Sequence, residues 1–205
     1  GYVLFYGEGY YFQHPEQILA FNKGGMSFHG GLIGALLAGI AAAKLTRIPY
    51  LTLADLGCIG APLGLLFGRC ANFINGELWG APTDAAWGVV FGGAAGTMPR
   101  HPSQLYEAFL EGVVIFAVLY LLSRRMPPRP RGTFWGTFLV MYGCFRFLVE
   151  FVREPDAQLG YLWGGWLTMG QLLSVPLILV GAGVLVYALV VKKPQKGLPE
   201  MKQSE

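Results

Sequence analysis

Five apolar stretches, each long enough to cross a lipid bilayer, constrain this chain more than any other feature of its sequence. They run roughly over residues 27–43, 52–68, 103–123, 133–152 and 168–191. A helical span needs about 20 mostly apolar residues to cross about 30 Å of hydrocarbon. We therefore predict an all-α fold, a polytopic transmembrane helical bundle.

The two ends of the chain complete this prediction. The opening letters GYVLFY are apolar, and we expect them to be the tail of a helix that begins before residue 1. The predicted fold is thus five complete spans plus the tail of a truncated one. Residues 1–191 are predicted to form a single membrane-embedded domain, and residues 192–205 a polar cytoplasmic tail.

Composition agrees with a membrane setting. Hydrophobic residues make up 54% of the chain and charged residues 13%, with a mean hydropathy of +0.47, whereas soluble proteins average about 25% charged residues. The net charge of +3, without basic runs interleaved with aromatic residues, does not favour nucleic acid as a partner. The cysteines form no CxxC pair or Cys/His cluster, so neither a disulfide framework nor a zinc site is predicted.

The distribution of lysine and arginine predicts the orientation. Most of these residues lie in the segments after the first, third and fifth spans, which share one side: Lys44, Arg47, Arg124, Arg125, Arg129, Arg131, Lys192, Lys193, Lys196 and Lys202. The others are Lys23, Arg69, Arg100, Arg146 and Arg153. The positive-inside rule assigns the richer side to the cytoplasm.

Every unusual polar motif falls on the opposite, outer side. The motifs are GGMSFHGG (24–31), GRCANFINGELWG (68–80), PRHPSQLYE (99–107) and RFLVEFVREPD (146–156). An interfacial aromatic belt is expected on the same side, formed by Trp79, Trp87, Tyr161, Trp163 and Trp166. Because the motifs belong to four spans and share one membrane face, we predict a single site assembled between helices.

The fourth span carries ionisable residues along one helical stripe. Tyr142, Arg146, Glu150 and Arg153 are spaced four, four and three residues apart. An arginine in mid-span costs about 2.5–3.5 kcal/mol on insertion, so such residues are functional candidates by default. The structural alternative is that Arg146 and Glu150 form only a buried ion pair.

Arg69, at the end of the second span, also has a structural alternative. It could snorkel to the membrane interface without any further role. Its neighbours favour a site, because Asn72 and Asn75 follow at successive helical turns and Glu77 comes next.

The third span places Gln104, Glu107 and Glu111 on one helical face, at spacings of three and four. Two carboxylates in a membrane helix need partners, and the outer arginines are the obvious ones. We interpret the carboxylates as supports for those arginines rather than as acids or bases.

Two of the histidines lie at the outer start of a span. His14 lies in a polar loop without a predicted role, whereas His29 begins the first span among glycines and His101 begins the third. Each could be a hydrogen-bonding cap or could handle a proton. The residues alone leave both alternatives open.

The two outer arginines suit an anionic ligand. Guanidinium is permanently charged and matches phosphate oxygens with paired hydrogen bonds. Phosphate is the anion available at this depth, on phospholipid headgroups. No GxSxG serine motif and no metal-binding carboxylate cluster accompanies these arginines.

The motifs closely resemble those of the bacterial prolipoprotein diacylglyceryl transferase family. GGMSFHGGLIG, GRCANFINGELWG, RHPSQLYE and YGCFRFLVEFVREPDAQ occur in the family's order, and the second resembles its signature. The likeness covers nearly all of residues 1–191. It departs at the N-terminus, where family members have one complete helix and most of a second before GYVLFY, and in a shorter loop between Trp79 and Arg100.

The resemblance implies a reaction, partners and a location. The family transfers the diacylglyceryl group of phosphatidylglycerol to the thiol of the lipobox cysteine of a prolipoprotein, releasing glycerol phosphate without a cofactor or metal. The site would face the outer, periplasmic side of the bacterial cytoplasmic membrane. The resemblance implies that Arg69 and Arg146 are essential, and other family positions match His29, Asn72, Glu77, Gly80, His101, Tyr142 and Glu150. Together with the spacing of the polar residues, this predicts catalytic residues and substrate-binding residues. The predicted catalytic residues are Arg69, Arg146, His29, His101 and Tyr142, and the predicted substrate-binding residues are Arg69, Asn72, Asn75, Glu77, Gly80, Glu150 and Arg153.

Two rival functions make different predictions. A transporter or channel for an anionic solute needs polar residues through the full membrane depth, whereas the inner halves of these spans are almost bare of charge, with Asp55 as the exception. A scaffold held by buried ion pairs predicts that Arg69→Lys is nearly silent.

Overall fold

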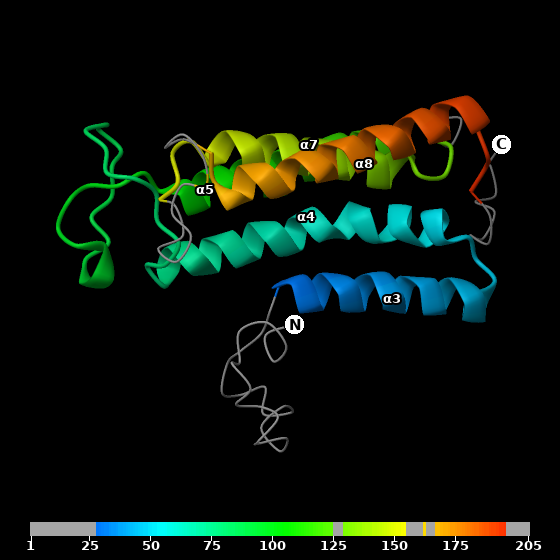
Figure 1. Ribbon diagram of the computed structural model, residues 1–205, viewed down its shortest axis with the longest axis horizontal. Helices are drawn as coiled ribbons and strands as arrows, with labels where there is room; N and C mark the ends of the chain where they lie inside the picture. Colours follow the sequence, from blue (N-terminus) through cyan, green and yellow to red (C-terminus); the bar gives the residue numbers. More distant parts are fainter. Residues whose placement is uncertain (1–27, 125–128, 155–161, 163–166, 196–205) are drawn as a thin grey trace, which may run out of the picture. The chain divides into compact units, whose positions relative to one another are not determined.

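The computed structural model describes residues 28–124, 129–154, 162 and 167–195, and these residues are all-helical apart from loops and isolated β-bridges (Figure 1). The chain divides into two compact units, residues 1–53 and residues 54–205. Each unit is described by itself below.

The first unit contains α3 (Phe28–Thr46) and the start of α4 (Tyr50–Ile74), joined by a tight turn. Thr46 fixes this turn, because its hydroxyl donates to the Ala42 carbonyl at 2.7 Å and lies 3.4 Å from the Ile48 amide, which donates to it. Gly39 lets the Tyr50 ring lie against α3, since a Cβ there would be 2.9 Å from Tyr50 Cε2.

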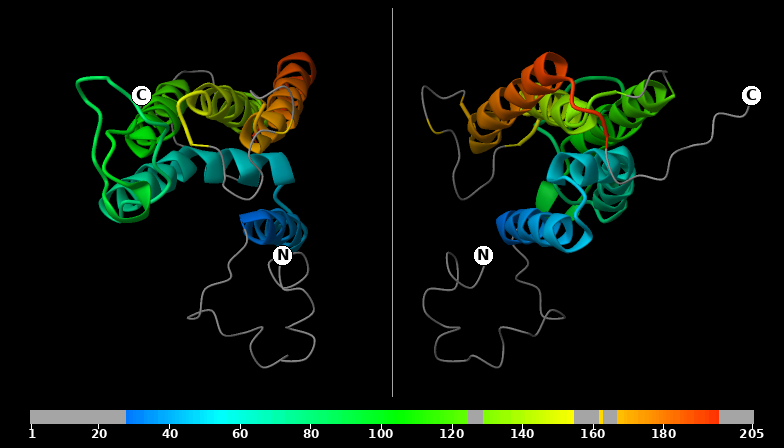
Figure 2. Two further views of the ribbon diagram at one scale, coloured as in Figure 1. Left: turned by 60° about the vertical axis from the view of Figure 1, so that its left-hand side comes forward. Right: turned by 90° about the vertical axis from the view of Figure 1, so that its right-hand side faces the viewer.

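The second unit contains the rest of α4, a long loop that includes η3 (Gly93–Ala95), and the remaining helices (Figure 2). These helices are α5 (Ser103–Glu107), η4 (Ala108–Val114), α6 (Ile115–Ser123), α7 (Thr133–Val149) and α8 (Met169–Val191). The segments α5, η4 and α6 form one continuous helix over Ser103–Ser123, and its middle part, η4, is π-helical.

The helix positions agree closely with the predicted apolar stretches. Among the described residues, α4, Ser103–Ser123 and α8 are long and apolar enough to cross a membrane, and two shorter apolar helices accompany them. Three helix ends differ from the prediction by three residues or more: α3 continues to Thr46 instead of residue 43, α4 continues to Ile74 instead of residue 68, and α7 ends at Val149 instead of residue 152.

Helices α7 and α8 pack closely in the second unit. A Cβ on Gly136 would lie 2.8 Å from Leu185 Cγ, so only glycine permits this approach. A small apolar core of Ile115, Leu119 and Phe134 lies between α6 and α7. Many large apolar side chains on the helices remain exposed, Leu179 at 66% among them, as expected where lipid rather than water covers the surface.

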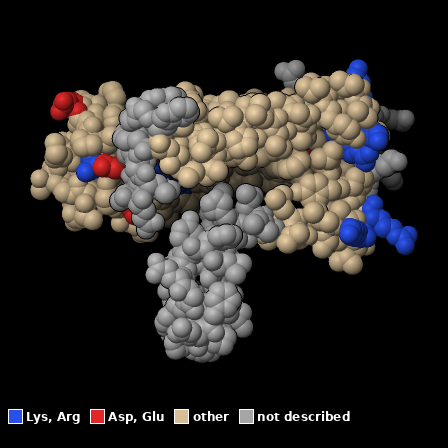
Figure 3. Space-filling view, in the orientation of Figure 1, with Lys and Arg blue, Asp and Glu red and all other residues tan. Residues whose placement is uncertain are grey.

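Asp55 links three segments at one end of this unit. Its carboxylate accepts hydrogen bonds from the amides of Gly132 (2.6 Å) and Trp135 (2.8 Å), at the start of α7, and from the Gln195 side chain (2.7 Å). Asp55, the one charge predicted in the inner half of a span, therefore caps α7. In Figure 3 the Lys and Arg atoms of this unit gather mainly at the end where α8 stops.

Candidate active site

Three of the four polar motifs meet at the opposite end of the second unit. The Gly80 amide donates to the His101 carbonyl at 2.9 Å, and the Ala81 amide donates to the Val152 carbonyl at 3.0 Å. The Gln104 side chain donates to the Glu77 carbonyl at 2.7 Å. The predicted gathering is confirmed for these three motifs, whereas GGMSFHGG belongs to the first unit and lies partly outside the described residues.

Glu107 joins three arginines from different segments. Its Oε1 atom accepts hydrogen bonds from Arg146 Nη1 at 2.8 Å and from Arg153 Nη1 at 3.1 Å. Its Oε2 atom forms an ion pair with Arg69 Nε at 3.0 Å. The expectation that the third-span carboxylates pair with the outer arginines is therefore confirmed.

Two further carboxylates complete this group. Glu150 Oε2 lies 2.9 Å from Arg146 Nη1, and Glu111 Oε2 lies 3.7 Å from Arg69 Nη2. Neither oxygen of Glu111 forms a hydrogen bond among the described residues. The resulting arginine cluster comprises three arginines and three glutamates: Arg69, Arg146, Arg153, Glu107, Glu111 and Glu150.

Burial within the arginine cluster is uneven. The side chains of Glu107 and Glu111 are 0% exposed, whereas those of Arg69 and Arg146 are 16% and 17% exposed. The carboxylates are therefore covered, while two guanidinium groups keep part of their surface accessible. Such a pair can receive an anion from outside the cluster.

The predicted stripe on the fourth span is helical only in part. Tyr142 and Arg146 lie on α7, but the helix ends at Val149, and Arg153 lies in a β-bridge with Gly80. The prediction of a helix through residue 152 was wrong because the chain turns there to pair with the loop before α5. Gly80 permits this pairing, since a Cβ would lie 2.6 Å from the carbonyl oxygens of both His101 and Val152.

Gly170 brings the start of α8 against the arginine cluster. A Cβ at this position would lie 2.6 Å from the carboxylate atoms of Glu150. Sequence reasoning did not single out this residue, because a glycine in an apolar helix carries no sign of what packs on it.

The polar residues that follow Arg69 form a separate group. The side-chain amides of Asn72 and Asn75 both donate to Glu77 Oε1, at 2.8 Å and 3.3 Å. The hydrogen bond from Asn72, followed by that from Asn75, lowers the pKa of Glu77 below its ordinary value. Within the described residues, the ion-pair partners of Arg69 are instead Glu107 and Glu111.

His101 takes part in a chain of hydrogen-bonding side chains. Trp87 Nε1 donates to the Tyr106 hydroxyl at 2.8 Å, and that hydroxyl lies 3.2 Å from His101 Nδ1. His29 lies in the first turn of α3, in the first unit, and its side chain lies outside the described residues. The Tyr142 ring stacks on Phe138 and packs against the core residues Ile115, Leu119 and Phe134.

Arg100 organises the loop before α5. Its guanidinium donates to the carbonyls of Ala95 (2.9 Å) and Gly80 (3.2 Å) and pairs with Glu154. It also lies over the Trp79 ring, 6.0 Å from the ring centroid. These contacts give Arg100 a structural role that its position in the sequence did not reveal.

Comparisons of this chain with a family model and with known proteins give the same family. Residues 1–187 match the model of the family described as prolipoprotein diacylglyceryl transferase. The chain is 53% identical over 197 residues to the phosphatidylglycerol–prolipoprotein diacylglyceryl transferase of Geobacter sulfurreducens, covering 96% of this chain and 73% of that protein. It is 53% identical over 188 residues to the protein of the same name from Methylococcus capsulatus, covering 92% and 71% of the two chains.

Proposed function

The chain belongs to the prolipoprotein diacylglyceryl transferase family, and on this premise we propose that it transfers the diacylglyceryl group of phosphatidylglycerol to a prolipoprotein cysteine. A thioether bond forms between the cysteine sulfur and the glyceryl carbon next to the phosphate. The bond from that carbon to the phosphate oxygen breaks, and glycerol phosphate leaves with the electron pair. The acceptor is the lipobox cysteine of the precursor.

The arginine cluster is the observation that supports this proposal most directly. In the proposed reaction the phosphate gains negative charge as it leaves, and a group that binds this charge more strongly as it develops accelerates the step. Arg69 and Arg146 are anchored through Glu107 and remain about one-sixth exposed. We assign these two arginines to the phosphate.

The other predicted site residues would have supporting roles around Arg69 and Arg146. Glu150 and Arg153 would hold the arginines in place through their contacts in the cluster. The group formed by Asn72, Asn75 and Glu77, together with Gly80, would shape the lipid-binding edge at the end of α4, and Tyr142 would line the site from α7. These roles are part of the proposal.

The acceptor thiol needs to lose its proton, because the thiolate is the nucleophile and a free cysteine has a pKa of about 8.5. His101 Nδ1 lies 3.2 Å from the Tyr106 hydroxyl, which also accepts a hydrogen bond from Trp87 Nε1, so one ring nitrogen of His101 is engaged within the site. We propose that a histidine, His29 or His101, accepts the thiol proton, and we assign this role first to His29 because glycines flank it in the sequence.

We also propose the finer membrane arrangement: five spans plus the tail of another, in the bacterial cytoplasmic membrane, with the arginine cluster toward the outer face. The basic segments at the other end support this orientation. A cysteine introduced near Arg129 should react with impermeant reagents only from the cytoplasmic side, and one near Ala85 only from outside. Labelling with the opposite sidedness would exclude the proposed orientation.

The rival functions fit the described residues less well. An anion path needs polar groups along the membrane depth, but Asp55, the acidic residue of the inner half, is buried and occupied in capping α7. Mutation of Arg69 and Arg146 distinguishes a scaffold held by buried ion pairs from a transferase.

The test uses Arg69→Lys and Arg146→Lys, because lysine keeps the charge but not the forked donors of guanidinium. The full-length enzyme in its membrane is incubated with phosphatidylglycerol and a lipobox peptide, and transfer is scored by the gain in peptide mass. Each variant should lose about 10²–10³-fold in kcat, as expected for loss of one transition-state donor. Normal transfer by both variants, at wild-type abundance, would refute the assignment.

A further inference from the structure

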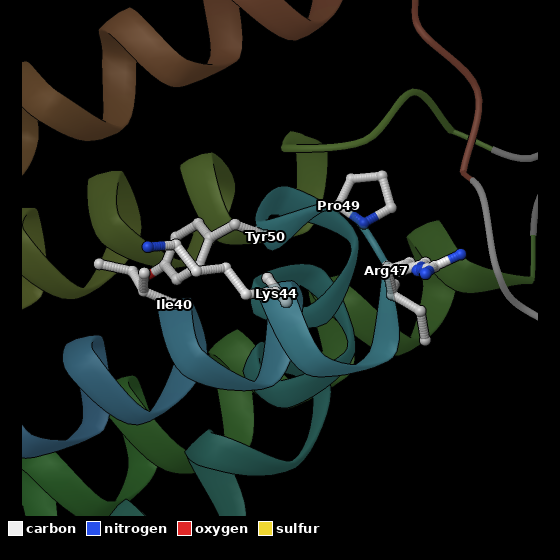
Figure 4. Close-up of a pocket in the computed structure, with 7 residues that line it drawn as sticks. Ile40, Lys44, Arg47, Pro49 and Tyr50 are labelled. Atoms are coloured by element: carbon white, nitrogen blue, oxygen red, sulfur yellow. The ribbon is translucent and has the colours of Figure 1, made fainter.

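A shallow, open groove on the first unit lies at the turn between α3 and α4. It has a volume of about 340 Å³ and is lined by Ile40, Ala43, Lys44, Arg47, Ile48, Pro49 and Tyr50. Figure 4 shows Tyr50 beside Ile40 and Lys44, with Arg47 and Pro49 toward the other end of the groove. None of these residues belongs to the arginine cluster.

The chemistry of the lining is amphipathic. Five of the seven lining residues are apolar or aromatic, and the other two, Lys44 and Arg47, are exposed cations. The stretch Phe28–Leu53, which is the described part of this unit, contains no aspartate or glutamate. The two cations therefore have no carboxylate partner within that stretch.

The wall of the groove is fixed by specific contacts. The Tyr50 ring packs against Gly39, where a Cβ would lie 2.9 Å from Tyr50 Cε2. The hydroxyl of Thr46 bonds to the backbone on both sides of the turn. These contacts fix the apolar wall of the groove, whereas the Lys44 and Arg47 side chains stay exposed and can adjust to a ligand.

Arg47 supplies a second observation. Its backbone is left-handed, with φ of 59°, although it is not a glycine. Residues persist in such conformations when their surroundings impose them, and they recur at ligand-binding positions. Lys44 lies in the last turn of α3, where the helix carbonyls favour a cation, but that preference does not account for the apolar wall beside it.

We propose that this groove binds the headgroup region of one anionic phospholipid. The lipid phosphate would contact Lys44 and Arg47, and its glycerol backbone and upper acyl chain would lie on Ile40 and Tyr50. Basic pockets between membrane helices on the cytoplasmic side commonly hold anionic headgroups. The site is distinct from the proposed transfer reaction, which the arginine cluster would carry out.

The experiment measures individual bound lipids by native mass spectrometry of the full chain in detergent, titrated with phosphatidylserine. This lipid is anionic but is not the proposed donor substrate. Each basic residue near a membrane contributes attraction that corresponds to about fivefold in affinity. The double variant K44Q/R47Q should therefore bind one phosphatidylserine about 30-fold more weakly than wild type, while phosphatidylcholine binding stays the same.

Two control variants separate a built groove from general surface charge. K192Q/K193Q removes two exposed cations that do not line the groove and should bind phosphatidylserine as wild type does. Gly39→Ala keeps both groove cations but displaces the Tyr50 ring. It should therefore weaken the binding of phosphatidylserine severalfold.

Several outcomes would overturn the proposal. If K44Q/R47Q binds phosphatidylserine as tightly as the wild type, the groove is not the binding site. If K192Q/K193Q loses as much affinity as K44Q/R47Q, the binding reflects general surface charge. Unchanged binding by Gly39→Ala would mean that the wall has no role. Displacement of the lipid by soluble glycerol phosphate would show that the groove recognises a free phosphate rather than a lipid. Arg69→Lys should leave this lipid in place, so the result is independent of the transfer reaction.

Discussion

Replacing Glu107 by glutamine should remove the centre of the arginine cluster with little change in side-chain shape. One carboxylate joins Arg146 at 2.8 Å, Arg153 at 3.1 Å and Arg69 at 3.0 Å, and its side chain is 0% exposed. The amide of glutamine has one acceptor oxygen, and its NH₂ group would face at least one guanidinium, donor against donor.

The magnitude follows from the loss of this buried charge. Removing one partner of a buried ion pair costs about 3–5 kcal/mol, because the remaining charge is left uncompensated. If a guanidinium moves by about 1 Å to relieve this cost, the rate of transfer can fall by about 10²-fold. We therefore expect Glu107→Gln to lower kcat and kcat/KM together by about 10²-fold or more, since the arginines would act on charge that develops in the transition state.

Glu111 provides a matched control one helical turn away. It is also 0% exposed, but its nearest arginine atom lies 3.7 Å away, and neither of its oxygens forms a hydrogen bond among the described residues. Glu111→Gln should therefore lower kcat less than Glu107→Gln, because it removes one ion pair at 3.7 Å and no hydrogen bond.

The assay compares transfer of lipid to a lipobox peptide by both variants and by Glu107→Asp, with protein abundance and helix content measured in parallel. Glu107→Asp keeps the charge but is one methylene shorter, so it should recover part of the activity lost in the glutamine variant. If Glu107→Gln transfers lipid at the wild-type rate, or if Glu111→Gln is the more damaged variant, the anchoring role of Glu107 is wrong.

Two further predictions concern other contacts of the site. Gly170→Ala should lower transfer activity about as much as Glu150→Ala, because its methyl group would occupy the space of the Glu150 carboxylate, 2.6 Å away; normal activity would show that Glu150 can move without consequence. His29→Gln should lower turnover by about 10²–10⁴-fold near neutral pH, and activity should recover as the pH rises through the thiol pKa of about 8.5 and the thiolate forms unaided. A uniform loss at every pH would make His29 a positioning residue, and recovery confined to His101→Gln would assign the base to His101.

The apolar pattern predicted the helices well because span length and residue type are local properties of a sequence. Two of the boundaries that differ, at Ile74 and Val149, lie where polar residues enter and hydropathy no longer decides the structure. There the outcome depends on long-range contacts, such as the β-bridge between Gly80 and Arg153. A spacing rule along one span cannot anticipate a partner located in another motif.

The residue types of the candidate site could be predicted from the sequence, but not all of the pairs that these residues form. Helical spacing suggested Arg146 with Glu150, and this pair is present at 2.9 Å. The larger arrangement, in which Glu107 joins arginines from two other segments, depends on how the helices pack. The grouping of Asn72 and Asn75 with Glu77, apart from the ion pairs of Arg69, also depends on the turn after α4. Sequence alone placed all four residues in one group.

The arginine cluster is difficult to explain by stability alone. Buried ion pairs often contribute no more to stability than apolar side chains of similar volume, because desolvation offsets their attraction. Glu107 and Glu111 are fully covered and bear most of this desolvation cost, whereas Arg69 and Arg146 keep 16% and 17% of their side-chain surface exposed. We propose that this exposed positive charge receives the phosphate of an anionic lipid, which the variants Arg69→Lys and Arg146→Lys test.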